Sequence, residues 1–533
     1  MAEEAQADIV RFLGDPSNWG DEGATLPPIR THGAYVFRGA RRALKLKRAV
    51  RFDYMDFSSP ERRRHFCEEE VRLNRRSAPD LYLRAVPVTR EEDGRLALGG
   101  AGQAVDWVVE MRRFDESTVL DEIARREGRI GTALLERLAD RVHAFHAVCE
   151  KRQDRGGADT FRDIVEVSQR QCGRFAGSIL DPAKVEALGR GQLRALERNG
   201  ALMERRRAQG FVRHGHGDLH LGNICLMEGV PVLFDCIEFN EDFSVTDVLY
   251  DLSFLIMDLC ERGQADGASL VLSRYMVHER QMDGLALLAL FLANRASIRA
   301  HVSCSMAEIA TAPDEAERLR RRAAHYVELG LAFLAEEPPR LLAVGGLSGS
   351  GKTTLARALA PLVGPPPGAL LLRSDELRKA MLGLELNRPA PPDAYGTETG
   401  DAVYAELRRR AGQALAAGRA VMVDAVHARP DERAALAQVA AERGLRFDGF
   451  WLEAAPAVME KRIEKRRGDA SDATVEVLRR QLSFDPGRID WTRLAAGADT
   501  EELAGQAQRH LALAGRRIIL NSGDSTPPTQ GGG

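Results

Sequence analysis

Residues 216–223 combine side-chain types that phosphoryl transfer requires. Their sequence, His-Gly-Asp-Leu-His-Leu-Gly-Asn, places Asp218 five residues before Asn223, and an apolar strand-like segment then ends at Asp235. In this spacing Asp218 can accept the proton of a substrate hydroxyl, while Asn223 and Asp235 supply the hard oxygen ligands that Mg²⁺ prefers. His216 would support the loop through a hydrogen bond. The pattern predicts a site that passes a phosphoryl group from ATP to an alcohol.

Such a site also needs a lysine on a strand, paired with a glutamate on the next helix. Lys45 and Lys47 lie on one face of an expected strand at 43–46. Lys45 is preferred because it stands in the middle of the apolar run, and Lys47 stays open as the alternative. On the following helix, Glu70 shares a face with apolar residues at helical spacing, and Glu69 is the alternative.

A second phosphate-binding pattern lies downstream. Residues 346–353, Gly-Leu-Ser-Gly-Ser-Gly-Lys-Thr, form a complete Walker A loop between an expected strand and an expected helix. Backbone N–H groups of the loop would cradle a phosphate at the helix N-terminus. Lys352 would bridge the β- and γ-phosphates of ATP, and Thr353 would bind Mg²⁺. The predicted nucleotide-binding residues of this loop are Gly346, Ser348, Gly349, Ser350, Gly351, Lys352, Thr353 and Thr354.

The strand expected at 369–372 is followed by Asp375, with Arg378 one helical turn later. This Asp-x-x-Arg element resembles that of P-loop kinases that phosphorylate hydroxyls, such as polynucleotide and gluconate-type kinases. The resemblance implies that Asp375 activates the acceptor hydroxyl and that Arg378 holds an acceptor or a phosphate. The alternative is that Asp375 only caps a helix that begins at Glu376.

Two further groups complete the second predicted site. Asp424 ends an apolar strand expected at 420–423 and is the Walker B candidate for the Mg²⁺ water shell; a simple strand-end aspartate is the alternative. Arg462 and Arg466 lie one helical turn apart after the fourth expected strand, where related kinases carry a lid over the transferring phosphate. A solvated basic helix, neutralised by flanking glutamates, explains the same pattern.

The order of the expected elements divides the chain into two domains. Two prolines and charged residues at 335–340 form a linker between unlike patterns. Residues 1–335 predict an α+β kinase-like fold, a small β-rich lobe followed by a helical lobe. Residues 340–522 alternate strand and helix, which predicts an α/β P-loop NTPase fold with a parallel sheet; residues 516–520 are a candidate for its last strand. Residues 523–533 lack large apolar side chains and are expected to be disordered.

The composition narrows the class of protein. The 533 residues are 44% hydrophobic and 29% charged with a net charge of −3, which is typical of a soluble enzyme and gives no global attraction to nucleic acid or anionic membrane. Seven scattered cysteines without a Cys-x-x-Cys pair indicate reduced thiols in a cytoplasmic protein, not disulfides or a zinc site. The acidic N-terminus has no apolar core, so we expect no signal peptide. The apolar run at 285–293 is too short to span a bilayer.

Residues 30–335 resemble the aminoglycoside phosphotransferase-like kinase family in the His-Gly-Asp motif, the following Asn and the later strand-end Asp. Asp251 looks like the later structural aspartate of that family. The resemblance implies a kinase that uses ATP and Mg²⁺ to phosphorylate a small hydroxylated molecule. No clear glycine-rich loop precedes Lys45. Residues 151–210 carry 13 Lys/Arg against 8 Asp/Glu; this net charge of +5 favours an anionic or neutral acceptor, and solvated helix faces explain it equally well.

As a whole, the chain resembles bacterial fusions of an aminoglycoside phosphotransferase-like kinase with a P-loop kinase. The first hypothesis is a bifunctional ATP-dependent phosphotransferase, each domain acting on the hydroxyl of a small molecule such as a sugar or nucleoside. A polynucleotide 5′-hydroxyl kinase would need a basic, aromatic-lined channel, and aromatic residues are sparse from residue 340 on. In the third hypothesis one domain senses nucleotide and regulates the other. The sequence leaves the acceptors and the oligomeric state open.

Overall fold

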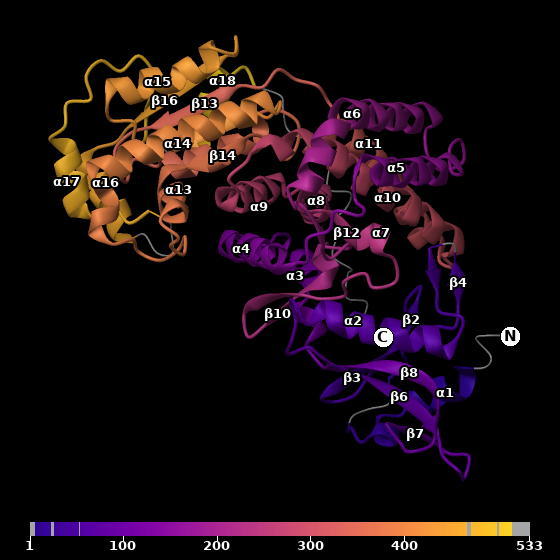
Figure 1. Cartoon of the computed structure of the whole chain (residues 1–533). Helices are drawn as coiled ribbons and strands as arrows, with labels where there is room; N and C mark the ends of the chain where they lie inside the picture. Colours follow the sequence, from indigo (N-terminus) through magenta and orange to yellow (C-terminus); the bar gives the residue numbers. More distant parts are fainter. Residues whose placement is uncertain (1–5, 23–25, 53, 466–470, 498–499, 514–533) are drawn as a thin grey trace, which may run out of the picture. The chain divides into compact units, whose positions relative to one another are not determined.

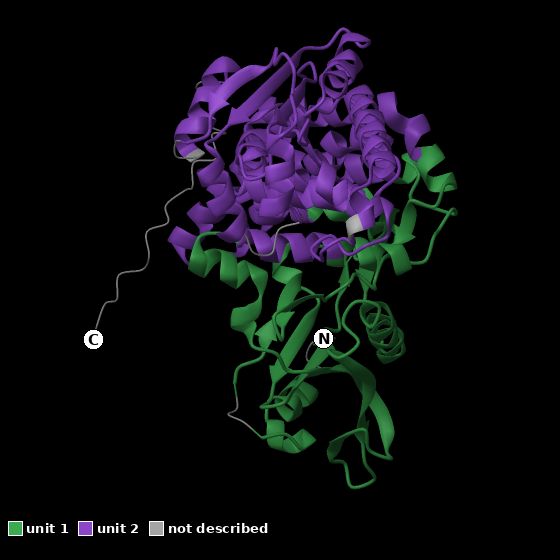
Figure 2. Ribbon diagram, turned by 90° about the vertical axis from the view of Figure 1, so that its left-hand side faces the viewer, with its two compact units in different colours: residues 1–130, 141–160, 204–254 green, residues 131–140, 161–203, 255–533 purple. Residues whose placement is uncertain are grey.

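The computed structural model divides the chain into two compact units (Figures 1 and 2). Unit 1 comprises residues 1–130, 141–160 and 204–254; unit 2 comprises residues 131–140, 161–203 and 255–533. Within these ranges the structure describes residues 6–22, 26–52, 54–465, 471–497 and 500–513. The expected linker at 335–340 lies inside unit 2. The candidate strand at 516–520 and the expected disordered tail at 523–533 lie outside the described residues.

Unit 1 is built on a six-stranded antiparallel sheet in the order β1-β2-β3-β8-β6-β7. The bounds of these strands and of the first long helix are β1 Ile29–Arg30, β2 Ala34–Arg38, β3 Arg42–Lys47, β6 Tyr82–Arg90, β7 Leu96–Leu98, β8 Gln103–Arg112 and α2 Pro60–Asn74. Alternate residues of β3 face opposite sides of the sheet. Leu44 and Leu46 pack with Phe37 in one core, so Lys45 and Lys47 face the other side, which α2 covers.

The rest of unit 1 carries residues 216–223, the predicted catalytic loop. A hairpin of β10 (Ile224–Met227) and β11 (Val230–Leu233) follows residues 216–223. Its two-residue turn, Glu228 and Gly229, has positive φ at both positions (53° and 78°), which suits the twist of a tight hairpin. Other elements of this region are α1 Ala7–Leu13, β4 Arg51–Phe52, β5 Met55–Asp56, α3 Leu120–Glu127, α4 Thr132–Val148, β9 Val212–His214, α7 Glu241–Ser244 and β12 Val245–Asp247, of which α4 lies in unit 1 in part.

Unit 2 contains a five-stranded parallel sheet in the order β14-β15-β13-β16-β17. Its elements are β13 Leu341–Gly345, α12 Lys352–Leu359, β14 Leu370–Arg373, α13 Ser374–Met381, α14 Thr397–Ala416, β15 Val421–Asp424, α15 Pro430–Ala441, β16 Phe447–Glu453, α16 Pro456–Lys465, α17 Val475–Leu482, β17 Thr492–Ala495 and α18 Thr500–His510. Leu342 and Val344 of the central strand pack in one core with Leu355 and Leu359 of α12 and Leu503 of α18. All five residues of β13 are buried, as expected of a parallel strand covered by helices on both faces of the sheet.

Unit 2 also holds helices that precede the parallel sheet in the sequence. They are α5 Ala158–Gly173, α6 Pro182–Ala208, α8 Val248–Glu261, α9 Ala265–His278, α10 Leu288–Ile309 and α11 Pro313–Phe333, of which α5, α6 and α8 lie in this unit in part. Helix α9 packs against the edge strand β14. The Ser273 hydroxyl accepts a hydrogen bond from the Leu371 N–H (2.9 Å), and the Ser269 hydroxyl donates to the Ala369 carbonyl (3.4 Å). Polar groups of this sheet edge are therefore satisfied by α9.

Among the described residues, one helical stretch is long and apolar enough to cross a membrane, Asp283–Ile309. In the structure 67% of its apolar window is buried, as in the core helix of a folded domain.

The predicted fold class is confirmed: an α+β kinase-like part is followed by a parallel α/β sheet. The sequence predicts strands at 341–344, 369–372, 420–423 and 447–452, which agree with β13, β14, β15 and β16 to within one residue at either end. The sequence predicts a helix at 402–416, whereas α14 begins at Thr397, five residues earlier. The fifth strand, β17, was not predicted, because its four residues contain a single buried side chain, Leu494.

Two candidate phosphoryl-transfer sites

In unit 1, a cluster of buried ion pairs joins strand β3 to helix α2. Lys45 Nζ lies 2.8 Å from Glu70 Oε1 and 2.5 Å from Asp235 Oδ1. Lys47 Nζ lies 2.7 Å from Glu70 Oε2 and also contacts Glu238. Both lysines thus bind the same glutamate, but only Lys45 reaches the aspartate predicted to hold the metal. The Lys47 side chain is 1% exposed and the Lys45 side chain 14%, so Lys45 borders the open side of the cluster.

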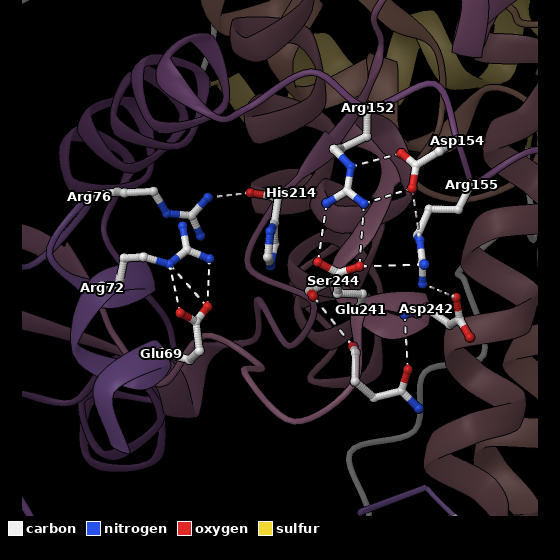
Figure 3. Close-up of polar contacts among 11 residues, drawn as sticks. Glu69, Arg72, Arg76, Arg152, Asp154, Arg155, His214, Glu241, Asp242 and Ser244 are labelled. Atoms are coloured by element: carbon white, nitrogen blue, oxygen red, sulfur yellow. Dashed lines mark hydrogen bonds and ion pairs between the residues drawn. The ribbon is translucent and has the colours of Figure 1, made fainter. Parts of the chain in front are cut away.

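The mutual attraction of these groups keeps them charged. Burial alone would lower the pKa of Lys45, but the carboxylates of Asp235 and Glu70 raise it well above its ordinary value. Burial alone would raise the pKa of Glu70, but Lys45 and Lys47 bring it to about 2. Glu69 instead binds Arg72 on the outer face of α2, with Oε1 3.1 Å from Nε (Figure 3). The structure therefore places Glu70, not Glu69, against the strand lysines.

Asp218 and Asn223 lie together in the predicted catalytic loop, residues 216–223. Asn223 Nδ2 donates to the Asp218 side chain (Oδ2, 2.9 Å) and to its carbonyl (3.0 Å). The Asn223 carbonyl accepts from the Phe234 N–H (3.0 Å), which sets Asn223 next to the residue preceding Asp235. His220 Nε2 lies 3.3 Å from Asp218 Oδ2. Because the Asp218 side chain remains 36% exposed, an acceptor hydroxyl could reach it.

Buried Asp251 holds the backbone of this loop. Its carboxylate accepts the N–H groups of His216 (2.7 Å) and Gly217 (2.9 Å), and His146 Nε2 lies 3.2 Å away. Burial alone would raise the pKa of Asp251, but the hydrogen bond and charge of His146 and the contacts of His216 keep it below its ordinary value. The His216 ring lies 2.9 Å from the Phe234 carbonyl. His216 therefore supports the loop, as the sequence predicted.

The basic segment 151–210 is extensively ion-paired, and Figure 3 shows the ion pairs of Arg152 and Arg155. Arg152 contacts Asp154 (2.7 Å) and Glu241 (3.1 Å), and Arg155 contacts Asp242 (2.9 Å). Further ion-paired basic residues of 151–210 are Arg170, Lys184, Arg190, Arg198, Arg206 and Arg207. Much of the net positive charge of the segment is thus neutralised locally, which favours the interpretation as solvated helix faces.

In unit 2, the Walker loop opens into a cavity of about 1460 Å³. Residues 348–354 line it, together with Asp375, Arg378, Asp424 and Arg462. Gly346 is outside the lining, and its N–H donates to the Val426 carbonyl (3.1 Å).

The predicted metal ligands of this site meet. Thr353 Oγ1 donates to Asp424 Oδ2 (2.7 Å), across the sheet edge at which β15 ends. Lys352 Nζ donates to the Leu347 carbonyl (2.9 Å), and Ser348 N–H donates to Gln481 Oε1 of helix α17 (2.8 Å). Gln481 was not predicted, because it lies 133 residues from its partner and no local pattern marks it.

Asp375 is not the N-cap of its helix. Helix α13 begins at Ser374, with Arg373 as the N-cap residue, so Asp375 lies inside the first turn. Its side chain hydrogen-bonds to Ser471. Burial raises the pKa of Asp375 above its ordinary value, and Arg373 and the Ser471 hydrogen bond oppose this. The alternative of a simple helix cap therefore does not describe this residue.

The two predicted arginines near the acceptor and the lid are both held by backbone carbonyls. Arg378 donates to the Ala394 carbonyl (2.9 Å) and lies over the Tyr395 ring (5.0 Å). Arg462 donates to the Ser350 carbonyl in the Walker loop (3.3 Å). Arg466 lies outside the described residues.

One further residue of this site was missed by sequence reasoning. Arg373 Nε lies 3.3 Å from Asp424 Oδ2, and its Nη1 lies 2.7 Å from Glu376 Oε1. Its position at the end of β14, beside Asp375, is the signal that could have identified it.

Comparison with known families assigns both parts of the chain. Residues 55–288 match the model of the phosphotransferase enzyme family, and residues 341–486 match that of an AAA domain of P-loop kinases. The chain is a fusion of two kinase domains. It is therefore an ATP-dependent phosphotransferase, and the families to which its domains belong use ATP.

The chain is similar to the following relative and solved structures, which differ in how much of it they cover. An uncharacterized protein of Mycobacterium tuberculosis is 29% identical over 491 residues, which cover 90% of this chain and 93% of the relative. A sugar kinase from Janibacter is 22% identical, with a TM-score of 0.27, over 33% of this chain and 96% of its own. A choline/ethanolamine kinase family protein from Mesorhizobium loti is 12% identical, with a TM-score of 0.35, over 62% of this chain and 99% of its own.

Proposed function

We propose that this kinase fusion is bifunctional, with domains at 1–335 and 340–522 that each transfer the γ-phosphate of ATP to a hydroxyl of a small molecule such as a sugar or nucleoside. One observation carries the proposal: each site holds a carboxylate beside groups suited to phosphate or metal. Asp218 lies against Asn223 in the first, and Asp375 shares the Walker-loop cavity in the second.

In the first site, the proposed base is Asp218, which orients the acceptor hydroxyl and takes its proton. Lys45 holds phosphate oxygens, and Glu70 orients Lys45. Asn223 and Asp235 offer amide and carboxylate oxygens, a donor set that fits Mg²⁺. When bound, Mg²⁺ neutralises charge on the phosphates.

In the second site, Lys352 is proposed to bind the β- and γ-phosphates, and Asp375 to act as the base. The hydroxyl of Thr353 and the carboxylate of Asp424, 2.7 Å apart, fit the hard-oxygen preference of Mg²⁺. Arg462 approaches the loop from the lid helix α16, where it can stabilise negative charge that develops on the transferred phosphoryl group.

A second candidate function, in which the first domain senses nucleotide and regulates the second, is favoured by one observation. The turn between β1 and β2, where kinases carry a glycine-rich loop, is held in place by side chains. Arg48 donates to the carbonyls of Thr31 (3.0 Å) and His32 (2.7 Å), and the His32 ring stacks on Phe52 with centroids 4.2 Å apart. Such a turn leaves less backbone free to cover the ATP phosphates.

The deciding experiment is a phosphate-transfer screen of the full chain with labelled ATP against sugars, nucleosides and oligonucleotides. Asp218→Ala should abolish transfer to one acceptor and Lys352→Ala transfer to another, because each removes a group of one site only. If Asp218→Ala leaves all transfer intact while nucleotide binding to the first domain persists, the regulatory function replaces the proposal. Labelling of oligonucleotides alone would favour a polynucleotide kinase.

The role of Asp375 has its own test. Asp375→Asn should keep the nucleotide affinity of the wild type and lower acceptor phosphorylation at least about a hundredfold, as expected for a positioned general base. Because the Asp375 pKa is raised, wild-type transfer should fall as the pH drops through that raised pKa, since the base acts in its ionised form. Residual transfer by the variant should lack this acid limb. Full transfer by Asp375→Asn would remove Asp375 as the base.

A further inference from the structure

A buried arginine outside the P-loop family match reaches into the P-loop site of unit 2. Arg274 of helix α9 is 2% exposed. Its Nε and Nη2 each lie 2.8 Å from the two carboxylate oxygens of Asp140, a bidentate pair. Its Nη1 lies 3.3 Å from Glu376 Oε1, and its Nη2 donates to Asn387 Oδ1 (3.2 Å).

Glu376 connects this arginine to the predicted metal ligands. The same oxygen, Glu376 Oε1, also accepts from Arg373 Nη1 (2.7 Å), so two guanidinium groups share one carboxylate oxygen. Arg373 in turn lies 3.3 Å from Asp424 Oδ2 and 3.4 Å from Thr353 Oγ1. A continuous series of polar contacts therefore runs from α9 to the pair expected to hold Mg²⁺.

The residues of this series are buried, so their relative positions strongly affect their electrostatic interactions. Arg373 and Glu376 are 3% and 4% exposed. Burial alone would raise the pKa of Glu376, but Arg373 and Arg274 lower it, so the carboxylate stays ionised. In such surroundings electrostatic interactions are stronger than in water, and a buried charge that loses its partner is costly. Glu376 is held by Arg274, and Arg373 is oriented by Glu376.

We propose that Arg274 is a positioning residue of the P-loop site, which acts through Glu376 and Arg373 on Asp424 and Thr353. The inference rests on the proposed function of that site. It means that phosphoryl transfer there depends on α9, a helix that precedes the P-loop sheet in the sequence and lies outside residues 341–486. Groups that orient metal ligands in this way typically change metal affinity or activity 10- to 100-fold when removed.

The test uses the full chain carrying Asp218→Ala, with Mg²⁺ and ATP as probes, so that only the P-loop site turns over. Arg274→Met should lower the kcat of ATP turnover about tenfold and raise the half-saturating Mg²⁺ concentration about threefold or more. The KM for ATP at saturating Mg²⁺ should stay within about twofold, because the Walker loop is untouched. Arg274→Lys keeps the charge but loses the bidentate guanidinium. This variant should therefore fold and show smaller changes in kcat and in the half-saturating Mg²⁺ concentration.

Two controls separate positioning from loss of packing. Arg410 of α14 also binds α9, through the carbonyls of Met276 and Val277 (3.2 and 2.8 Å), but has no contact with Glu376. Arg410→Met should lower stability without the Mg²⁺ shift. In a Glu376→Gln background, Arg274→Met should have little further effect on kcat, because the connection is already broken.

The outcomes are distinct. An unchanged Mg²⁺ dependence and kcat in both Arg274 variants, or an equal loss with and without Glu376→Gln, would overturn the inference. If Lys352→Ala in the Asp218→Ala background leaves ATP turnover unchanged, the proposed function of the P-loop site fails instead.

Discussion

At the scale of single residues, two neighbouring lysines of one strand illustrate how similar side chains take different roles. Lys45 and Lys47 point to the same face of β3, and both bind Glu70. Lys45 also reaches Asp235, whereas Lys47 is enclosed with Glu238. The first geometry suits phosphate binding in a kinase, and the second suits a fixed structural ion pair.

Substitution should separate these roles. Lys45→Met should leave the fold intact and strongly reduce first-site transfer, because the cation next to Asp235 is lost. Lys47→Met should destabilise the protein by about 3–5 kcal/mol, because Glu238 would be left buried without its partner. Urea denaturation and transfer assays of both variants check this. Equal stability of the two variants, or full transfer by Lys45→Met, would contradict the assignment.

At the scale of elements, Asp472, which follows helix α16 in the sequence, forms hydrogen bonds with helix α13 and the region that follows it. The Asp472 carboxylate accepts from Lys379 Nζ (2.9 Å), from the Ala390 N–H (2.8 Å) and from the Tyr395 hydroxyl (2.7 Å). The Lys379 side chain is fully buried, and Asp472 is 14% exposed. Because Tyr395 also stacks under Arg378, this contact shapes the predicted acceptor side of the cavity.

Asp472→Asn should weaken the contacts between this residue and the region that follows α13. The variant should lose about 3–5 kcal/mol of stability, because Lys379 keeps a buried charge without a carboxylate. Hydrogen exchange should speed up at residues 386–395, and the KM for the acceptor should rise more than the KM for ATP. Asp485→Asn is the matched control: Asp485 is exposed and its Oδ1 accepts the Gly487 N–H, which an asparagine can also accept. Unchanged exchange at 386–395 in Asp472→Asn would refute this role.

At the scale of the whole molecule, the compact units differ from a simple division at the 335–340 linker. Helices within 255–333 and the parallel sheet belong to one unit. Helix α9 has a strongly apolar face. Its residues Val271, Leu272, Tyr275 and Met276 are almost fully buried. Its serines also satisfy the edge of β14. An exposed sheet edge is a site for aggregation, so its coverage by α9 is physically significant.

A fragment of residues 338–533 should therefore be less stable than the same region in the full chain. We expect a lower melting temperature and a tendency to aggregate, because the β14 edge and the apolar surface under α9 become exposed. A fragment of residues 255–533 retains α9 and should melt closer to the full chain. Calorimetry and light scattering of the two fragments check this. Equal melting temperatures would show that α9 contributes nothing to the P-loop region.

The sequence by itself determined the parts whose chemistry is local. The Walker loop, the catalytic-loop spacing of Asp218 and Asn223, and the expected strands β13 to β16 follow from short-range patterns, because a helix or a strand repeats over a few residues. Periodicity also placed Lys45 and Glu70 on facing surfaces, 25 residues apart. The sequence did not predict β17, because a four-residue strand with one buried side chain carries almost no periodic signal.

Only the tertiary structure decided which of these groups meet and what holds them. Lys47 and Glu238 are 191 residues apart, and Arg274 and Glu376 are 102 apart. No local pattern relates such pairs, because their contact depends on how whole elements pack. The same reason explains Asp375: its sequence allowed a helix cap, whereas the observed start of α13 at Ser374 placed it in the first turn, facing the cavity. Local spacing specifies the reacting groups, and long-range packing of charged side chains specifies their geometry.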